Sequence, residues 1–292
     1  MSGTTRIAET TYSPYTGART GRAAAVVTVA VAGIRQVLGL GRQARHKILP
    51  IVTVAISYLP AVVFVGVAVL IPNSILQAGD TAEYSGYYSL IGNAVLLFTA
   101  FVAPEILAAD RRTGMLALYL STPLTRTSYL VSKAAGLTAV LLLVTLGPPL
   151  LLLAGYTVEG LGPSGFGEWM LLLGRIALGS LVLSALYAAL ALGITSVAGR
   201  RAAASIAIVL LVVVGASLTS VAVEAASADA RWYLLNAAFV PFELVVRIFG
   251  TSDPAGPMFE VSTWTVTAGY LAWLAGGAAV AWLRYRRIGA DG

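Results

Sequence analysis

Long apolar runs separated by short polar connections dominate this chain. About 20 consecutive apolar residues are needed to cross the hydrocarbon core of a bilayer as a helix. Six runs meet or approach that length, and we predict that they are membrane-spanning helices. They lie at about 48–71, 87–108, 134–156, 169–198, 202–223 and 263–283. The fourth run is long and carries Arg175, so we expect its first turn to reach the membrane interface.

Composition agrees with this pattern. Of the 292 residues, 58% are hydrophobic and only 11% are charged, which is typical of an integral membrane protein. We therefore predict an all-α integral membrane protein. The apolar runs leave little chain for a soluble domain, so a single transmembrane domain is expected over residues 22–292. Residues 1–21 are rich in Ser, Thr, Gly and Arg and are predicted to form a disordered cytoplasmic tail.

Basic residues are distributed unevenly among the connections. Of the 19 Lys and Arg residues, 16 lie before the first run, between the second and third, between the fourth and fifth, or after the sixth. The positive-inside rule makes these segments, and therefore both termini, cytoplasmic. The excess of Arg over Lys and the abundance of Ala, Gly, Val and Leu suggest a GC-rich bacterial genome, and hence a bacterial plasma membrane. We expect aromatic belts at the outer interface (Tyr84, Tyr87, Tyr88, Trp169, Trp232, Trp264) and at the inner one (Trp282, Tyr285).

Residues 22–47 form the first of two segments that are not expected to span. They combine an apolar stretch with Arg35, Arg42 and Arg45, which is typical of an amphipathic helix lying in the cytoplasmic interface. A signal peptide cleaved near Ala30–Ala32 is the alternative. That alternative conflicts with the orientation that the other connections support.

Residues 234–249 form the second such segment, between the fifth and sixth runs. Pro241, Glu243 and Arg247 interrupt its apolar character, so a full crossing is disfavoured. Helices that enter the membrane part-way and return would bury the apolar surface and leave the charges in water. An external cap helix remains the alternative.

Residues suited to catalysis are scarce. There is no cysteine, and the single histidine, His46, lies in a basic stretch before the first span. We therefore expect no catalytic residue, no metal site and no intramembrane protease chemistry. The chain also lacks a Gly-x-x-x-x-Gly-Lys-Ser/Thr loop, so it is not expected to bind a nucleotide itself. If the protein moves a substrate, the energy comes from another chain.

The connection between the second and third spans carries the most informative motif. It opens on a charged cluster at Asp110–Arg112, continues through an apolar patch at Met115–Leu120, stops at Pro123 and closes with Arg126 and Lys133. The apolar patch is too short to cross a membrane. An apolar ridge flanked by positive charge suits docking to a soluble partner, or lying among lipid headgroups.

Residues 103–133 resemble the second cytoplasmic signature of ABC-2 type transporter permeases. The shared features are the acidic and basic cluster, Gly114, the apolar stretch, and Ser121-x-Pro-Leu followed by Arg126. The resemblance implies a permease of an ABC exporter in which a coupling helix between the second and third spans docks on a separate ATPase subunit. ATP and Mg²⁺ would be bound by that subunit, and two ATPases would serve two permease copies, identical or homologous, among membrane lipids. No nucleic acid partner is expected.

Two groups of site residues follow from this resemblance. The first would contact the ATPase: Asp110, Arg111, Arg112, Gly114, Met115, Leu116, Leu118, Leu120 and Arg126. The second would line a translocation path between the copies, on the second and fifth spans: Asn93, Phe98, Thr99, Ser217, Thr219 and Ser220. Hydroxyl groups in spans also commonly bond to helix carbonyls. The apolar spans would tolerate a hydrophobic or lipid-like substrate.

Two other classes of protein remain open at this point. A non-transporting membrane scaffold would have no ATPase partner. A secondary transporter would need a coupling-ion site, and no predicted span carries an ionisable residue near its middle.

Overall fold

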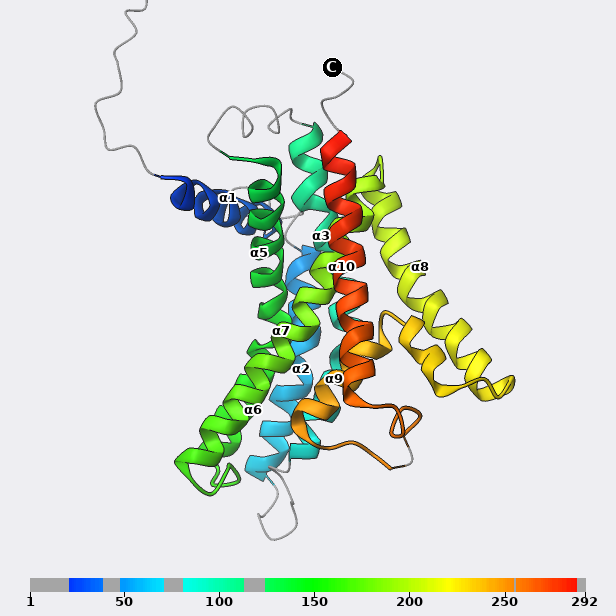
Figure 1. The fold of residues 1–292 in the computed structure, drawn as a ribbon. Helices are drawn as coiled ribbons and strands as arrows, with labels where there is room; N and C mark the ends of the chain where they lie inside the picture. Colours follow the sequence, from blue (N-terminus) through cyan, green and yellow to red (C-terminus); the bar gives the residue numbers. More distant parts are fainter. Residues whose placement is uncertain (1–20, 39–47, 71–80, 113–123, 255, 288–292) are drawn as a thin grey trace, which may run out of the picture.

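The computed structural model describes residues 21–38, 48–70, 81–112, 124–254 and 256–287. Every regular element in these ranges is helical (Figure 1). The elements are α1 (Arg22–Val37), α2 (Ile48–Leu70), α3 (Thr81–Arg112), α5 (Arg126–Thr145), α6 (Gly147–Val158), α7 (Phe166–Val197), α8 (Arg201–Ser220), a π-helical turn (Val221–Ala225), a 3₁₀ helix (Ala230–Leu235), α9 (Phe239–Phe249) and α10 (Thr263–Arg287).

Six helices in these ranges are long and apolar enough to cross a membrane, as predicted. They run over Pro50–Leu70, Tyr84–Leu107, Arg126–Val158, Phe166–Val197, Arg201–Ala225 and Thr263–Arg287. The third begins eight residues earlier than predicted, because Thr125 and Ser128 form a capping box that starts α5 at Arg126. It is divided into α5 and α6 at Leu146, directly before Gly147-Pro148-Pro149. A proline has no N–H to donate, so the run of helical hydrogen bonds is interrupted there.

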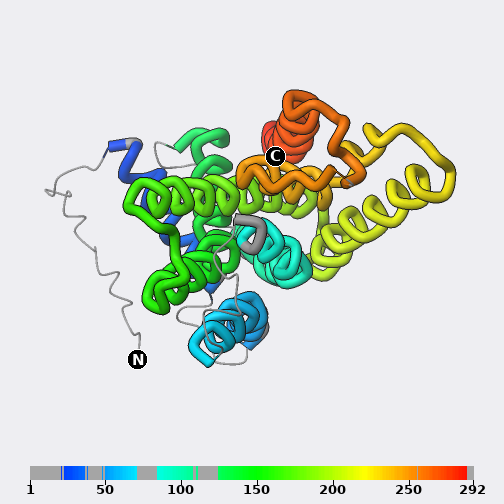
Figure 2. The backbone as a smooth tube through the Cα atoms, turned by 90° about the horizontal axis from the view of Figure 1, so that it is seen from below, coloured from blue at the N-terminus to red at the C-terminus, as the bar shows by residue number. Residues whose placement is uncertain are grey.

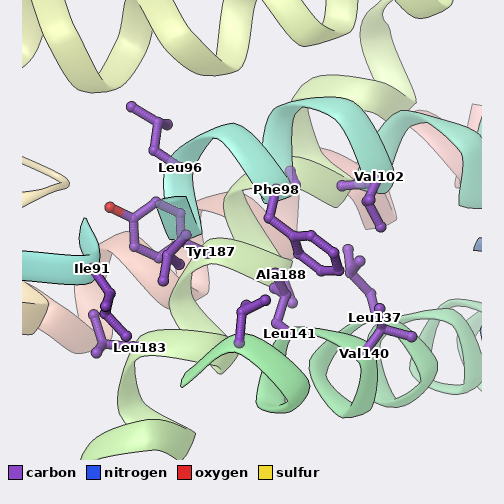
Figure 3. Close-up of a cluster of buried hydrophobic side chains, with 14 of the residues drawn as sticks. Ile91, Leu96, Phe98, Val102, Leu137, Val140, Leu141, Leu183, Tyr187 and Ala188 are labelled. Atoms are coloured by element: carbon purple, nitrogen blue, oxygen red, sulfur yellow. The ribbon is translucent and has the colours of Figure 1, made fainter. Parts of the chain in front are cut away.

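Helix α7 occupies the middle of the bundle. It packs against α3, α5, α9 and α10, and α3 and α7 are the most buried spans. Seen from below, α2 and α8 lie on the periphery with α3 between them (Figure 2). Phe98 of α3 is fully buried in the core beside Leu137 and Val140 of α5 (Figure 3). In contrast α2, α8 and α10 leave most of their apolar side chains exposed or only half-buried, as expected of helices that face lipid or another chain.

Helix α1 crosses the bundle near the ends of α3 and α5 (Figure 1). It approaches α5 so closely that a Cβ atom at Gly136 would lie 2.9 Å from the carbonyl oxygen of Ala30. Gln36 also donates a hydrogen bond to the carbonyl of Glu105 on α3, at 3.2 Å. The helix predicted within residues 22–47 therefore exists, over Arg22–Val37, and it is fastened to two spans.

Helix α9 is embedded in the bundle. A Cβ atom at Gly92 of α3 would lie 3.0 Å from the Phe242 ring, and one at Gly179 of α7 would lie 3.5 Å from both Val245 and Phe249. Gly179 is about 20 Å along α7 from Phe166, at 1.5 Å per residue. The helix ends at Gly250, whose φ of +73° places it in the left-handed region that glycine adopts without strain.

Two predicted elements lie outside the described residues. They are the coupling helix over Met115–Leu120 and nearly all of the disordered tail over residues 1–21.

Candidate functional site: the basic end of the bundle

Four spans begin or finish on an arginine at one end of the molecule, which we call the basic end, and α1 packs beside two of them. There α3 finishes at Arg112, α5 begins at Arg126, α8 begins at Arg201 and α10 finishes at Arg287. The two helix ends that border residues 113–123, those of α3 and α5, both belong to it. The Arg126 guanidinium donates to the carbonyl of Arg286 at 2.7 Å, which joins the start of α5 to the end of α10.

A buried ion pair joins α3 to α5 at this end. The Lys133 Nζ lies 2.7 Å from Asp110 Oδ2, and the two side chains are 0% and 5% exposed. The Tyr129 hydroxyl donates to the same Asp110 oxygen at 2.8 Å. Gly33 of α1 lies beside the aliphatic stem of Lys133, since a Cβ atom at Gly33 would lie 3.8 Å from Cδ of Lys133. Opposite charges are thus placed in contact, away from water, on either side of residues 113–123.

Two tyrosine rings extend this cluster to α10. The Tyr129 ring lies 5.8 Å from the Tyr285 ring, centroid to centroid, and the Lys133 ammonium lies 5.6 Å from the Tyr129 centroid. Both tyrosines are buried. Burying a charge is costly unless it is paired and hydrogen-bonded, so the positions of Asp110, Lys133 and Tyr129 are strongly constrained. A shift of α3 relative to α5 must therefore change the contacts between Asp110, Lys133 and Tyr129.

A second ion pair joins α3 to α8. The Arg201 guanidinium bonds to the Glu105 carboxylate and also donates to the carbonyl of Phe101 at 3.2 Å. Arg201 is 43% exposed, so water weakens this attraction far more than that of the buried pair. With Gln36 on the backbone of Glu105, the last two turns of α3 are bound to α1, α5 and α8 together.

The residues predicted to contact an ATPase are placed as follows. Asp110 faces the interior and binds Lys133, so its side chain is not on the surface of the chain. Arg126 is partly exposed at the start of α5. Arg111 and Arg112 form the last two residues of α3. The remaining five lie outside the described residues: Gly114, Met115, Leu116, Leu118 and Leu120.

The residues predicted to line a translocation path are divided between surface and core. Asn93 and Ser217 are exposed, and Ser220 is partly exposed. Phe98 and Thr99 are fully buried, with the Thr99 hydroxyl donating to the carbonyl of Val95 at 2.7 Å. Thr219 is also buried, and its hydroxyl accepts a 3.2 Å hydrogen bond from Asn236. Packing and local hydrogen bonds thus hold Phe98, Thr99 and Thr219 inside the single chain, and their place on a translocation path stays a prediction.

Sequence reasoning missed the role of Lys133, which it counts only among the basic residues that close the connection. A signal was present in its spacing. Tyr129, Lys133, Leu137 and Val140 recur every three or four residues, so Lys133 shares one helix face with apolar residues. All four are buried. A lysine on an apolar face requires a buried acid, but only the fold shows that Asp110 is that acid.

Metal binding has no support among the residues that the structure describes. No group of three or more His, Cys, Asp or Glu side chains comes together there in a way that suits an ion. Together with six apolar spans, the arrangement defines a multi-pass membrane protein in which four spans begin or finish on an arginine at one end.

The sequence comparisons identify the family. A family model described as ABC-2 family transporter protein matches residues 70–283. The chain therefore belongs to the ABC-2 transporter family, and the predicted resemblance is confirmed. No curated protein matches the chain significantly. Permeases of this family normally work with an ABC ATPase partner, and they are transport components that are generally not catalytic themselves.

Proposed function

We propose that this chain is the permease subunit of an ATP-driven exporter, and that the basic end is where a separate ATPase drives it. The observation that carries the proposal is the Asp110–Lys133 pair, which clamps α3 to α5 on either side of residues 113–123 in a chain of the ABC-2 family. The chain binds no nucleotide of its own in this proposal. ATP and Mg²⁺ belong to the partner subunit, and the basic end and both termini face the cytoplasm of a bacterial cell.

Movement of the ATPase would be transmitted to the spans through helices α3 and α5, which flank residues 113–123. An apolar ridge would dock on the partner, formed by Met115, Leu116, Leu118 and Leu120 beside Gly114. Arg111 and Arg112 would pair with acidic groups of the partner, and Arg126, held on the carbonyl of Arg286, would border the docking surface. Asp110 acts one step further in, through Lys133. Because α3 continues past Pro104 to Arg112 and α5 starts at Arg126, a push on the ridge would tilt both helices together.

The accessory helices take their roles from their contacts. Helix α1 would lie in the cytoplasmic interface, because it is held against α3 and α5 at the basic end. Helix α9 would be re-entrant, since it is packed against the middle of α7 through Gly179 and against Gly92 of α3. These contacts support re-entry over an external cap.

The transported substrate would pass between two permease copies. Helix α8 supports this, because it leans away from the bundle (Figure 1) and exposes Ile206, Leu210 and Leu218. Asn93, Ser217 and Ser220 are the predicted path residues that remain available at the surface. The apolar character of this surface suits a hydrophobic or lipid-like substrate.

The test is purification of the tagged chain from its native membrane in mild detergent, with mass spectrometry and an ATPase assay. We expect stoichiometric recovery of a subunit with nucleotide-binding motifs, and loss of that subunit in Leu118→Glu. Leu235→Glu is the matched control, because Leu235 is 59% exposed at the opposite end of the molecule. Recovery of the chain alone in several detergents would instead favour a scaffold or a secondary transporter.

A further inference from the structure

An apolar groove runs along the outside of the bundle between α5, α7 and α10. It encloses about 370 Å³, and its lining is almost entirely Ala, Leu and Val side chains. Thr127 and Trp282 lie at the end nearest the basic end, and Thr138 and Leu274 lie further along α5 and α10. None of the described residues that line it is charged. We call this feature the α5–α7–α10 groove.

The dimensions of the groove match one hydrocarbon chain. Thr127 and Thr138 are about 16 Å apart along α5, at 1.5 Å per residue. That is close to one leaflet, which is half of a hydrocarbon core of about 30 Å. Spread over this length, 370 Å³ corresponds to a mean cross-section of roughly 20 Å². A helix with its side chains is about 10–12 Å across and needs several times that area.

Two arginines stand at the basic end of the groove. Arg126 directly precedes Thr127, and its guanidinium is bound to the carbonyl of Arg286 at 2.7 Å. The Arg286 guanidinium carbon lies 5.2 Å from the centre of the Trp282 ring, which itself lines the groove. Among the residues that the structure describes, no carboxylate forms an ion pair with either arginine. Two cations thus adjoin the mouth of a slot for one alkyl chain.

We propose that the α5–α7–α10 groove binds an anionic phospholipid, with one acyl chain in the slot and the phosphate between Arg126 and Arg286. Basic pockets between spans on the cytoplasmic side are suited to such headgroups. Arginine binds phosphate through paired N–H donors. A zwitterionic lipid carries a cation of its own beside the phosphate, so its headgroup is attracted less strongly to the two arginines. Only the choice of the cytoplasmic leaflet rests on the orientation in the proposed function; the site itself does not need ATP coupling.

The test is native mass spectrometry of the full-length protein, released from micelles that contain phosphatidylglycerol or phosphatidylcholine with the same acyl chains. We expect one retained phosphatidylglycerol and at least tenfold lower occupancy by phosphatidylcholine. Arg126→Gln with Arg286→Gln should remove this preference. Arg284→Gln is the matched control, because Arg284 is an exposed arginine in the same last turn of α10.

The apolar part of the site is tested separately. Ala278→Phe places a ring in the slot and should abolish retention, whereas Ala279→Phe, an exposed neighbour that does not line the groove, should not. Ala134→Leu narrows the slot from the α5 side and serves as the second variant if Ala278→Phe does not fold. Thermal unfolding checks that each variant is intact.

Three outcomes overturn the proposal. The first is equal retention of the two lipids by the wild type, which marks ordinary surrounding lipid. The second is unchanged phosphatidylglycerol retention in both groove variants. The third is a dimer that dissociates in Ala278→Phe, which would assign the groove to a second copy of the chain. None of these results depends on an ATPase, so failure here is distinct from failure of the proposed function.

Discussion

The two ends of the bundle use buried charge in different ways. At the basic end, Asp110 and Lys133 belong to different spans and hold α3 against α5. At the opposite end, Glu243 and Arg247 are four residues apart on one helix, with Arg247 Nε 2.8 Å from Glu243 Oε1. Arg247 also binds the carbonyl of Met258 and the hydroxyl of Thr263, so it joins α9 to the start of α10.

The Asp110–Lys133 pair therefore joins two helices, whereas the Glu243–Arg247 pair lies within one helix. A pair on one helix is visible in its i, i+4 spacing and stabilises that helix wherever it packs. A pair between helices exists only in one packing arrangement, so it responds when the helices move. We therefore expect the basic end to report on movement and the α9 end to hold its shape.

The largest effect is expected from Lys133→Met. The substitution leaves the Asp110 carboxylate buried without its cation, and should lower the free energy of unfolding by about 3–5 kcal/mol. Chemical unfolding of the purified protein in detergent measures this.

The control for that variant removes both charges. Asp110→Asn with Lys133→Met should recover most of the lost stability, because no unpaired charge remains. If the ion pair clamps α3 to α5, this double variant should fold yet show altered ATPase activity in its complex. Equal instability of the single and double variants would contradict the clamp.

A smaller loss is expected from Arg247→Met. It removes one ion pair and two further hydrogen bonds around a nearly buried guanidinium, and should cost about 2 kcal/mol of unfolding free energy. Arg231→Met is the control and should be neutral, because Arg231 is 75% exposed and its nearest Asp229 oxygen is 4.0 Å away. ATPase activity of the complex should not change in Arg247→Met, in contrast to the variants at Asp110 and Lys133.

Gly136→Ala tests whether α1 belongs to the basic end. The added Cβ would meet the backbone of Ala30 at 2.9 Å, so α1 must shift, at a cost of about 1–2 kcal/mol. Faster hydrogen exchange of the α1 amides should accompany the loss. Gly174→Ala on α7 is the matched control: nothing lies within 4 Å of its Cβ, so it should be neutral or slightly stabilising. Unchanged hydrogen exchange of the α1 amides in Gly136→Ala would show that α1 is not held at the basic end by this contact.

The smallest effect is expected from Arg201→Gln, at no more than about 1 kcal/mol, because Arg201 is partly exposed. Raising ionic strength from about 0.05 to 0.5 M should shrink the difference from wild type, since the screening length falls severalfold. The effect of Lys133→Met should not depend on salt, because its pair is shielded from solvent. If the loss of unfolding free energy in Lys133→Met depended on salt, this would show that water reaches the Asp110–Lys133 pair.

Much of the fold could be predicted from the sequence. Run length alone placed six spans within a few residues of the observed helices, apart from the early start of the third. Mixed apolar and basic residues predicted the helix before α2, and Pro241 with two charges set α9 apart from the true spans. The resemblance over residues 103–133 identified the family.

The tyrosines show where such reasoning stops. Tyr84, Tyr87 and Tyr88 were expected in an outer aromatic belt, but all three are buried inside the bundle. The Tyr87 hydroxyl donates to the carbonyl of Ser57 at 2.6 Å, and Tyr88 donates to that of Ile176 at 3.0 Å. An apolar ring with one polar atom suits either a lipid interface or a helix contact, so composition does not separate the two.

By itself, then, the sequence predicted the six helices of the described residues that are long and apolar enough to cross a membrane, and the family to which the chain belongs. Both follow from local properties, namely apolar length and a contiguous motif. Only the tertiary structure decided that Lys133 is buried on Asp110, that Phe98 is core, and that α9 lies against Gly179. Each of these depends on residues far apart in the chain, and a charge or a ring gains its energetic meaning from the neighbours that packing supplies.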